Sequence, residues 1–127
     1  MSHWLMLGGF GALGAICRAA LGVWLNPVAT SGMPWGTVAA NLLGCFLLGF
    51  LAGFTLSSDR IPTPLRAPLM TGFLGSFTTF STFSVESIRL LEAGAYTTAL
   101  LSVGLQVLGG LLLAGAGLAL GRMLAQH

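Results

Sequence analysis

Four long apolar segments limit what this chain can fold into. They run over residues 3–25, 34–56, 65–91 and 96–121, and each has at least the roughly 20 residues that a membrane-spanning helix needs. Charged residues form 6% of the chain, against about a quarter in soluble domains, so the chain cannot cover a surface that faces water. A helix satisfies its backbone polar groups by itself inside a bilayer. The sequence therefore predicts an all-α membrane protein, with four transmembrane helices in one domain over residues 1–127.

The remaining composition argues against several classes of protein. The net charge of +2, from five arginines and no lysine, provides no basic patch for nucleic acid. Cys17 and Cys45 both lie in apolar segments, where we expect small buried hydrophobes rather than a disulfide. Three acidic residues and two histidines near the chain ends offer no pairing of a nucleophile with a base, so we expect no enzyme active site. Gly9–Gly14 fits a dinucleotide-binding pattern, but the first acidic residue is Asp59, so we interpret these as packing glycines.

Residues 71–84 are the least helix-like part of the third segment. This stretch, TGFLGSFTTFSTFS, holds two glycines, four threonines, three serines and four phenylalanines. Glycine and threonine are mediocre helix formers, and hydroxyls compete for backbone hydrogen bonds. Irregular backbone at membrane depth is tolerated only where it is buried in protein or lines a wet cavity. We therefore expect the third helix to break mid-membrane near Gly75–Thr79, where freed carbonyls suit a cation such as Na⁺.

Small residues and arginines bear on how many chains assemble. Glycines four residues apart, at 49 and 53 and at 117 and 121, let membrane helices pack closely. Packing inside one monomer would use them, but we favour a homodimer, because four thin helices cannot easily pack this surface and also enclose a polar path. If the N-terminus is cytoplasmic, three arginines lie on that side (60, 66 and 122) and two on the other (18 and 89). Such a weak bias permits both orientations in the membrane, and with them an antiparallel dimer.

Three polar side chains interrupt the first two segments. Arg18 is costly inside a membrane and so marks either a functional position or a long side chain that reaches the interface. Asn41 is the one amide or acidic side chain in the body of the second segment. Its two N–H donors could replace water around an anion, or could form an interhelical hydrogen bond. Thr37 lies four residues earlier on the same helix face and could extend a polar track.

Phe80 and Phe83 share one face of a helix at a spacing of three residues. Phenylalanines in membrane helices commonly face lipid or neighbouring helices. Here the hydroxyl-rich stretch upstream suggests a second interpretation, in which the positive edges of the rings line a path for a small anion. Ring edges would attract the ion without trapping it as a fixed arginine would.

Polar residues in the second half of the chain form two spaced pairs. Ser102 and Gln106 lie four residues apart and give the fourth segment its polar face. Glu86 and Arg89 lie three residues apart, where we expect an interfacial ion pair, and Glu86 could border a pore mouth.

Together these pieces resemble the Fluc (CrcB) family of small fluoride channels. The matching pieces are GGFGALGA at residues 8–15 with Arg18, Gly36-Thr37 with NLLG at residues 41–44, and GFLGSFTTFSTF at residues 72–83. The resemblance covers the whole chain. Ala19 departs from it, because an aromatic residue is expected after the arginine.

The resemblance implies an architecture and a function. It implies a dual-topology, antiparallel homodimer in the inner (plasma) membrane of the cell, with two pores that export fluoride passively. It also implies a structural Na⁺ at the dimer centre, held by the backbone carbonyls of Gly75 and Thr78, and Arg18 in a vestibule. The implied fluoride-pore residues are Asn41, Phe80 and Phe83, with Thr37, Ser81, Ser84 and Ser102 as lining companions.

Two other functions fit a four-helix membrane protein. A small multidrug or cation antiporter relies on a membrane-embedded carboxylate in its first helix, and residues 3–25 contain none. A membrane scaffold that transports nothing would explain the packing glycines but would not need a broken third segment.

Overall fold

The regular structure of the chain is helical. The computed structural model describes residues 2–25 and 32–126, and within these ranges it contains helices and no strands. The elements are α1 (Ser2–Leu25), α2 (Trp35–Ser57), α3 (Thr63–Ala67), the π-helix η2 (Pro68–Leu74), α4 (Gly75–Phe77), α5 (Phe80–Glu92), α6 (Tyr96–Gly104), the π-helix η3 (Leu105–Gly109) and α7 (Gly110–Ala125).

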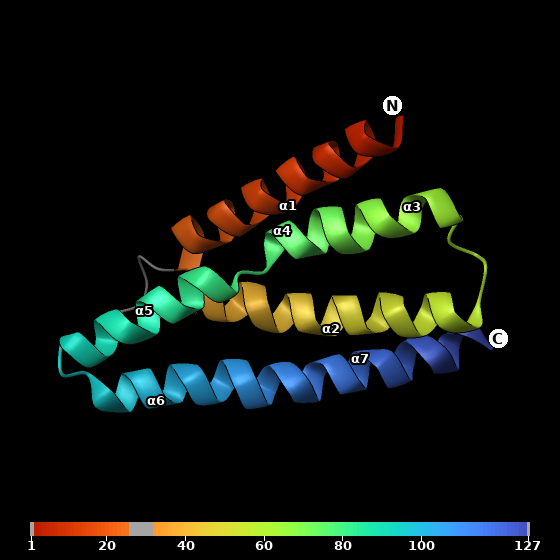
Figure 1. Ribbon diagram of the computed structural model, residues 1–127. Helices are drawn as coiled ribbons and strands as arrows, with labels where there is room; N and C mark the ends of the chain where they lie inside the picture. Colours follow the sequence, from red (N-terminus) through yellow and green to blue (C-terminus); the bar gives the residue numbers. More distant parts are fainter. Residues whose placement is uncertain (1, 26–31, 127) are drawn as a thin grey trace.

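These elements form four rods, as Figure 1 shows. The first rod is α1 and the second is α2. The third is the run α3–η2–α4, which is followed after a short interruption by α5, and the fourth is the continuous run α6–η3–α7. Each observed rod begins and ends within four residues of the span expected from the sequence.

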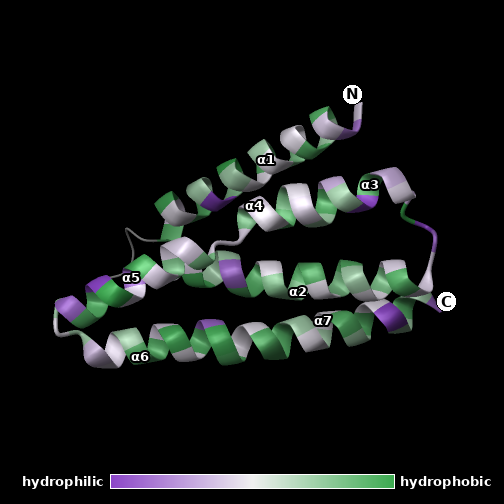
Figure 2. Ribbon diagram, viewed as in Figure 1, coloured by the Kyte–Doolittle hydropathy of each residue, from purple (hydrophilic) through white to green (hydrophobic). Residues whose placement is uncertain are grey.

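Three helices in the described part of the chain are long and apolar enough to cross a membrane without interruption. They are Ser2–Leu25, Trp35–Ser57 and Tyr96–Ala125. In Figure 2, the green of hydrophobic residues covers most of the length of these helices. The chain is therefore an integral membrane protein by length and composition, and its third rod differs from the other three because it is interrupted.

Glycines allow the backbones of α2 and α7 to touch. A Cβ atom added to Gly49 or Gly53 would overlap backbone atoms of α7, at Ala114 and Leu118. A Cβ added to Gly117 or Gly121 would likewise overlap backbone atoms of α2. These four glycines are thus used for packing within one chain, so they are not in themselves grounds for a dimer. Their close approach also sets where the middle of α2 lies against the fourth rod.

The first rod packs on the third in the same manner. A Cβ on Gly14 of α1 would overlap the backbone of Phe73, and one on Gly72 would lie 2.9 Å from the Leu7 carbonyl oxygen. The other faces of α1 are largely exposed, and they carry large hydrophobic side chains such as Trp4, Ile16 and Trp24. An apolar, exposed surface of this kind suits contact with lipid.

Arg66 ties the end of α2 to the start of the third rod. Its guanidinium donates to the carbonyl oxygens of Thr55 (3.4 Å), Ser58 (3.4 Å) and Ile61 (3.1 Å). It also pairs with the Asp59 carboxylate at 2.8 Å, the one ion pair within 4 Å among the described residues. Arg66 therefore satisfies the Thr55 carbonyl, which lies in the last turn of α2, together with two carbonyls of the following loop.

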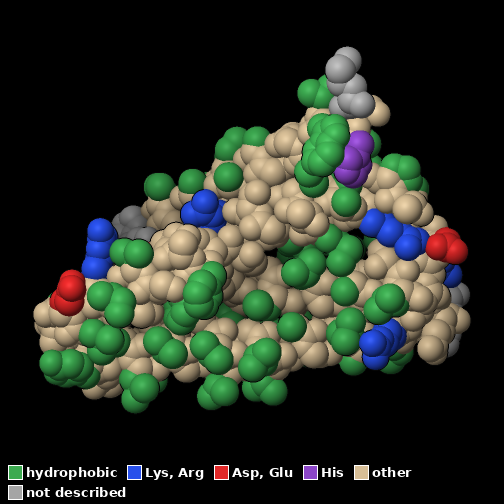
Figure 3. Space-filling model, viewed as in Figure 1, with side chains coloured by type: hydrophobic (Ala, Val, Ile, Leu, Met, Phe, Trp, Pro, Cys, Tyr) green, Lys and Arg blue, Asp and Glu red, His purple; other side chains and the backbone are tan. Residues whose placement is uncertain are grey.

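Most of the charged side chains visible in Figure 3 lie toward the two ends of the molecule, and one basic side chain lies further in, over α1. The N-terminus, the loop around Asp59 and the C-terminus lie at one end, and the turn between α5 and α6 lies at the other. Large hydrophobic side chains cover much of the surface between the two ends, which suits contact with lipid.

Replacing Gly117 by Ala should separate α2 from α7. The added methyl group has no room against the backbone of Phe46 and Phe50, and overpacking of this kind costs about 1–3 kcal/mol. Gly115→Ala is the matched control, because a Cβ there meets nothing within 4 Å. Thermal unfolding in detergent should show a lower midpoint for the first variant and an unchanged or higher one for the second. Equal midpoints would contradict the close packing of these helices.

Candidate functional site

Two threonines interrupt the third rod. Helix α4 ends at Phe77, Thr78 and Thr79 both adopt extended backbone (φ −86°, ψ 160° and φ −155°, ψ 113°), and α5 begins at Phe80. The interruption lies within the expected range Gly75–Thr79. However, Gly75 itself is helical (φ −63°, ψ −34°), so the expectation that this glycine helps to break the helix was wrong. Gly72 is also helical, and it serves the close contact with α1.

Asn41 replaces hydrogen bonds that the interruption removes. Its Oδ1 accepts from the backbone N–H of Thr79 at 2.7 Å, and its Nδ2 donates to the Thr79 carbonyl at 3.1 Å. The side-chain amide thus pairs with one backbone residue as a neighbouring β-strand would. A buried backbone group without a partner costs about 1–3 kcal/mol, so this pair stabilises the break.

The same amide continues into the fourth rod. Asn41 Nδ2 also donates to Gln106 Oε1 at 2.6 Å, and Gln106 Nε2 donates to Ser102 Oγ at 3.0 Å. Gln106 lies in η3, and both Ser102 and Gln106 are buried. The three side chains form a continuous chain of hydrogen bonds that links α2, the break, η3 and α6. Gln106 and Ser102 were recognised in the sequence as a polar face, but their link to Asn41 was not.

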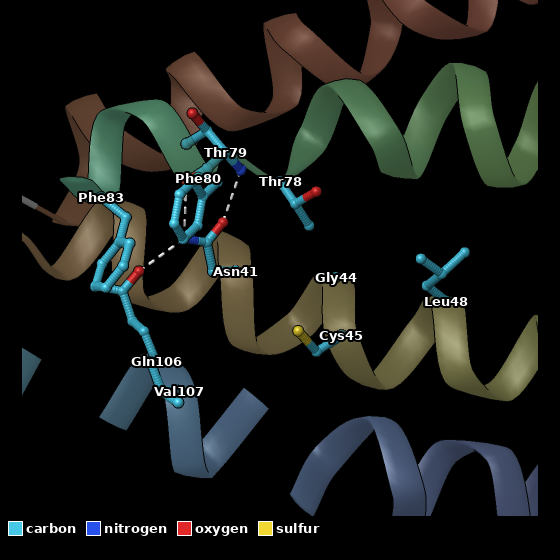
Figure 4. Close-up of a pocket in the computed structure, with 10 residues that line it drawn as sticks. All are labelled: Asn41, Gly44, Cys45, Leu48, Thr78, Thr79, Phe80, Phe83, Gln106 and Val107. Atoms are coloured by element: carbon cyan, nitrogen blue, oxygen red, sulfur yellow. Dashed lines mark hydrogen bonds between the residues drawn. The ribbon is translucent and has the colours of Figure 1, made fainter. Parts of the chain in front are cut away.

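A cavity of about 240 Å³ lies beside the break, and Figure 4 shows the residues around it. The rings of Phe80 and Phe83 lie 5.6 Å apart between centroids, tilted by 50°. Phe83 is buried, whereas Phe80 is 78% exposed. The complete lining is Asn41, Gly44, Cys45, Leu48, Thr78, Thr79, Phe80, Phe83, Gln106 and Val107. The structure therefore brings together Asn41, Phe80 and Phe83, which the sequence analysis proposed as one site.

Thr79 caps α5 at the edge of this cavity. Its Oγ1 accepts from the Thr82 backbone N–H at 3.2 Å and bonds the Thr82 hydroxyl at 2.9 Å. Helix α5 therefore begins at the cavity, and its N-terminus brings a partial positive charge there. The sequence analysis did not single out Thr79, although a hydroxyl residue before a helical segment is a known N-cap signal.

Other expected site residues lie away from the cavity. Thr37 donates to Glu86 Oε1 at 2.9 Å, and Ser84 donates to the Phe80 carbonyl at 2.9 Å. Ser81 lies in a shallow hollow with Thr82, Val85, Glu86 and Arg89. Ser102 is behind Gln106 and only 1% exposed. These four hydroxyls are thus distributed along α2, α5 and α6 rather than gathered with Asn41.

Glu86 does not form the ion pair expected from the sequence. No contact within 4 Å joins it to Arg89, because its Oε1 bonds to Thr37 on the neighbouring helix instead. Its Oε2 is buried and has no hydrogen-bond partner among the described residues.

Arg18 reaches the break from the opposite side to Asn41. Its Nε donates to the Ser76 carbonyl at 3.2 Å, so Arg18 joins α1 to the end of α4. Among the described residues, no donor contacts the carbonyl oxygens of Gly75, Phe77 or Thr78.

The fold and the site together define a class of protein: a small helical membrane protein with a polar, aromatic-lined cavity at an interrupted helix. The family described as "CrcB-like protein, Camphor Resistance (CrcB)" matches residues 5–118. This match includes both sides of the break and the Gln106 region, and the chain belongs to the Fluc (CrcB) family.

Individual relatives match most of the chain. A protein of Stutzerimonas stutzeri named "Fluoride-specific ion channel FluC" is 48% identical over 113 residues, covering 89% of this chain and 91% of that protein. A protein of Bordetella bronchiseptica with the same name is 43% identical over 122 residues, covering 96% of this chain and 93% of that protein. A Listeria monocytogenes protein named "Fluoride-specific ion channel FluC 2" is 42% identical over 123 residues, covering 97% of this chain and 90% of that protein.

Removing the cap of α5 should weaken the break. Thr79→Ala deletes the hydroxyl that accepts from Thr82 and should lower the free energy of unfolding by about 1 kcal/mol. Thr79→Ser keeps the oxygen and should retain most of that stability. Unfolding of both variants by a graded detergent mixture, followed by circular dichroism, measures the difference. Equal losses would mean that the methyl group, rather than the cap, is what matters.

Proposed function

We propose that this protein is a fluoride-selective ion channel, through which fluoride leaves the cell passively so that its cytoplasmic concentration falls. The observation that carries this proposal is the extent of the similarity to proteins named fluoride-specific ion channels. It spans 80% or more of this chain and of each of those relatives. The residues around the cavity lie within the stretch that matches the family.

The cavity has chemistry suited to a small, strongly hydrated anion. Such an ion must exchange its water for hydrogen-bond donors and positive ring edges. Phe80 and Phe83 can supply ring edges, and the amides of Asn41 and Gln106 are the polar groups nearby. The N-terminus of α5 adds a favourable potential. No lysine or arginine lines the cavity, so the ion would be attracted without being held.

The hydroxyl residues would extend the path on both sides of the cavity. Ser81 and Ser84 each line a shallow hollow on α5 that also contains Arg89. Thr37 and Ser102 would contribute from α2 and α6. Arg18 would attract anions at a vestibule while it holds the Ser76 carbonyl.

The pore would be completed in an antiparallel homodimer with two pores. Phe80 is 78% exposed although it lines the cavity, so a second copy of the chain could close that side. The charges also suit both orientations in the membrane, because three arginines favour one side and two the other. The membrane would be the inner (plasma) membrane, which the chain crosses several times.

A structural Na⁺ would lie at the dimer centre. Within the described part of the chain, no donor contacts the carbonyl oxygens of Gly75 and Thr78, whereas Arg18 and Asn41 donate to the carbonyls of Ser76 and Thr79. Free carbonyls of an interrupted membrane helix are a donor set that suits Na⁺. The bound cation would hold these oxygens together and neutralise their dipoles.

The alternative functions are not favoured. The three acidic residues, Asp59, Glu86 and Glu92, all lie outside α1, so the carboxylate that a small multidrug antiporter uses there is missing. A scaffold would not need the hydrogen-bonded break or its cavity. The family is one of ion channels, and this chain is not an enzyme.

Purified protein in liposomes should release fluoride but not chloride. Liposomes are loaded with potassium fluoride in a sodium-containing buffer, and valinomycin lets K⁺ leave with fluoride so that charge stays balanced, while an electrode follows external fluoride. Protein-free liposomes give the background, and liposomes loaded with chloride test selectivity. Absence of fluoride release, or chloride release at the same rate, would contradict the proposed function.

Removal of Na⁺ should weaken both transport and assembly. Without a cation, the carbonyls of Gly75 and Thr78 would have no partner that offsets their dipoles. Purification and assay with N-methyl-D-glucamine in place of Na⁺ should lower the fluoride flux and the dimer fraction, measured by light scattering. Restored Na⁺ should return both. Flux and mass that stay constant after exhaustive exchange would argue against the sodium site.

A further inference from the structure

One end of the molecule carries an excess of positive side chains. Three of the five arginines, at positions 60, 66 and 122, lie at the end that holds the loop around Asp59 and the C-terminus. Asp59 is the one acidic residue in these parts of the sequence, so three arginines against one aspartate give a formal charge of +2. Figure 3 shows basic side chains gathered at this end.

The opposite end has no such excess. Arg89 shares α5 with Glu86 and Glu92, so acidic residues outnumber basic ones near the turn between α5 and α6. Arg18 lies further in, seven residues before the end of α1, and donates to the Ser76 carbonyl. An anionic partner is therefore attracted to the end with the loop rather than to the end with the turn.

Two of the three arginines at the basic end have no anionic partner. Arg66 pairs with Asp59 and donates to three carbonyls, so its charge is largely offset. Arg60 and Arg122 are both exposed, and neither guanidinium forms an ion pair or a hydrogen bond within the described residues. Both groups therefore keep their N–H donors for a ligand.

The loop that carries Arg60 is held in place. Arg66 donates to carbonyls on both sides of this residue, at Thr55, Ser58 and Ile61. The backbone N–H of Arg60 also donates to Ser58 Oγ at 3.2 Å. An arginine on an ordered loop loses less conformational freedom on binding than one on a mobile segment, so this loop is suited to hold a ligand.

Helix packing brings Arg122 to the same end as this loop. A Cβ atom added to Gly53 of α2 would lie 3.1 Å from the Arg122 backbone nitrogen. Helix α2 ends at Ser57, four residues or about 6 Å further along its axis, and Arg60 follows three residues later. The two unpaired cations therefore lie on neighbouring rods at one end of the molecule.

Exposed apolar side chains adjoin both arginines. Leu56, in the last turn of α2, is 72% exposed, and Met123 and Leu124, directly after Arg122, are 55% and 43% exposed. In a membrane such side chains meet acyl chains, whereas the arginine side chains reach the headgroups. Arginine can donate two parallel hydrogen bonds to a phosphate. The combination fits a phospholipid better than a soluble anion, which would use the guanidinium groups alone.

We propose that this basic end is a binding site for an anionic phospholipid. The guanidinium groups of Arg60 and Arg122 hold the headgroup phosphate, and the apolar side chains beside them contact the acyl chains. The site requires only that the chain lies in a membrane, and it is separate from the cavity and from the path of fluoride. In the antiparallel dimer proposed above, the two copies of the site would face opposite leaflets.

Lipid retention by the unmodified protein is the first test. Protein in a mild detergent is mixed with phosphatidylglycerol, or with phosphatidylcholine of the same acyl chains, and native mass spectrometry counts the lipids that stay bound. Phosphatidylglycerol should be retained in a saturable manner, and phosphatidylcholine should not. Glycerophosphoglycerol has the same headgroup without acyl chains, and in excess it should displace little of the lipid. Equal retention of the two lipids would overturn the proposal, and complete displacement by the headgroup would reassign the site to a soluble anion.

Variants connect the site to the two arginines. Arg60→Gln combined with Arg122→Gln should weaken the retention of phosphatidylglycerol roughly tenfold or more, because each arginine near an anionic headgroup contributes severalfold. Arg89→Gln removes a charge at the other end and should retain the lipid as the parent protein does. Neither Arg60 nor Arg122 has a side-chain partner to lose among the described residues, so the unfolding midpoint in lipid-free detergent should not change.

Two results with folded variants would overturn the proposal. One is a double variant that retains phosphatidylglycerol as well as the parent protein. The other is an equal loss in Arg89→Gln, which would mean that the lipid responds to the net charge of the chain rather than to this end. If the double variant does not fold, the competition between the two lipids on the unmodified protein decides.

Discussion

A helix can be interrupted inside a bilayer only if a partner, from the protein or from water in a cavity, takes up the backbone groups that it releases. In this chain that partner is one side chain, the amide of Asn41, which pairs with both the N–H and the carbonyl of Thr79. Arg18 approaches from α1 and takes the Ser76 carbonyl. Because polar side chains from two neighbouring helices satisfy these groups, α5 can start afresh at Phe80. The cavity, the phenyl rings and the free carbonyls all depend on this interruption.

Much of the fold could be predicted from the order of residues along the chain. The length of each apolar run sets its helix, because a bilayer has a fixed thickness, and the expected spans differ from the observed rods by four residues or fewer. The region of the break followed from its hydroxyl content. Its location at Thr78–Thr79 did not, because it depends on where Asn41, 38 residues away, meets the third rod. Gly75 has the freedom to leave a helix, but its N–H keeps helical hydrogen bonds to the carbonyls of Gly72 and Met70.

The same limit applies to the candidate site. Phe80 and Phe83 could be placed on one helix face by their spacing, but not with one ring buried and the other exposed. Thr37 and Glu86 are 49 residues apart, and Asn41 and Gln106 are 65 apart. A sequence shows that each of these side chains needs a partner in an apolar surrounding, but it does not show which one. Glu86 accepts a hydrogen bond from the Thr37 hydroxyl on α2 and forms no ion pair with Arg89, which lies one turn away on its own helix.

The π-helix at Leu105–Gly109 has a consequence for how the fourth rod uses its surface. A π turn holds about one residue more than an α turn, and each residue of an α-helix advances the side chains by about 100°. The turn therefore rotates the part of the rod that carries Gly117 and Gly121 relative to the part that carries Ser102. One rod can in this way place Ser102 and Gln106 near the break and place Gly117 and Gly121 against the backbone of α2. Deleting a single residue between 105 and 109 would still leave the rod long and apolar enough to cross a membrane, but its two halves would no longer contact the same neighbours.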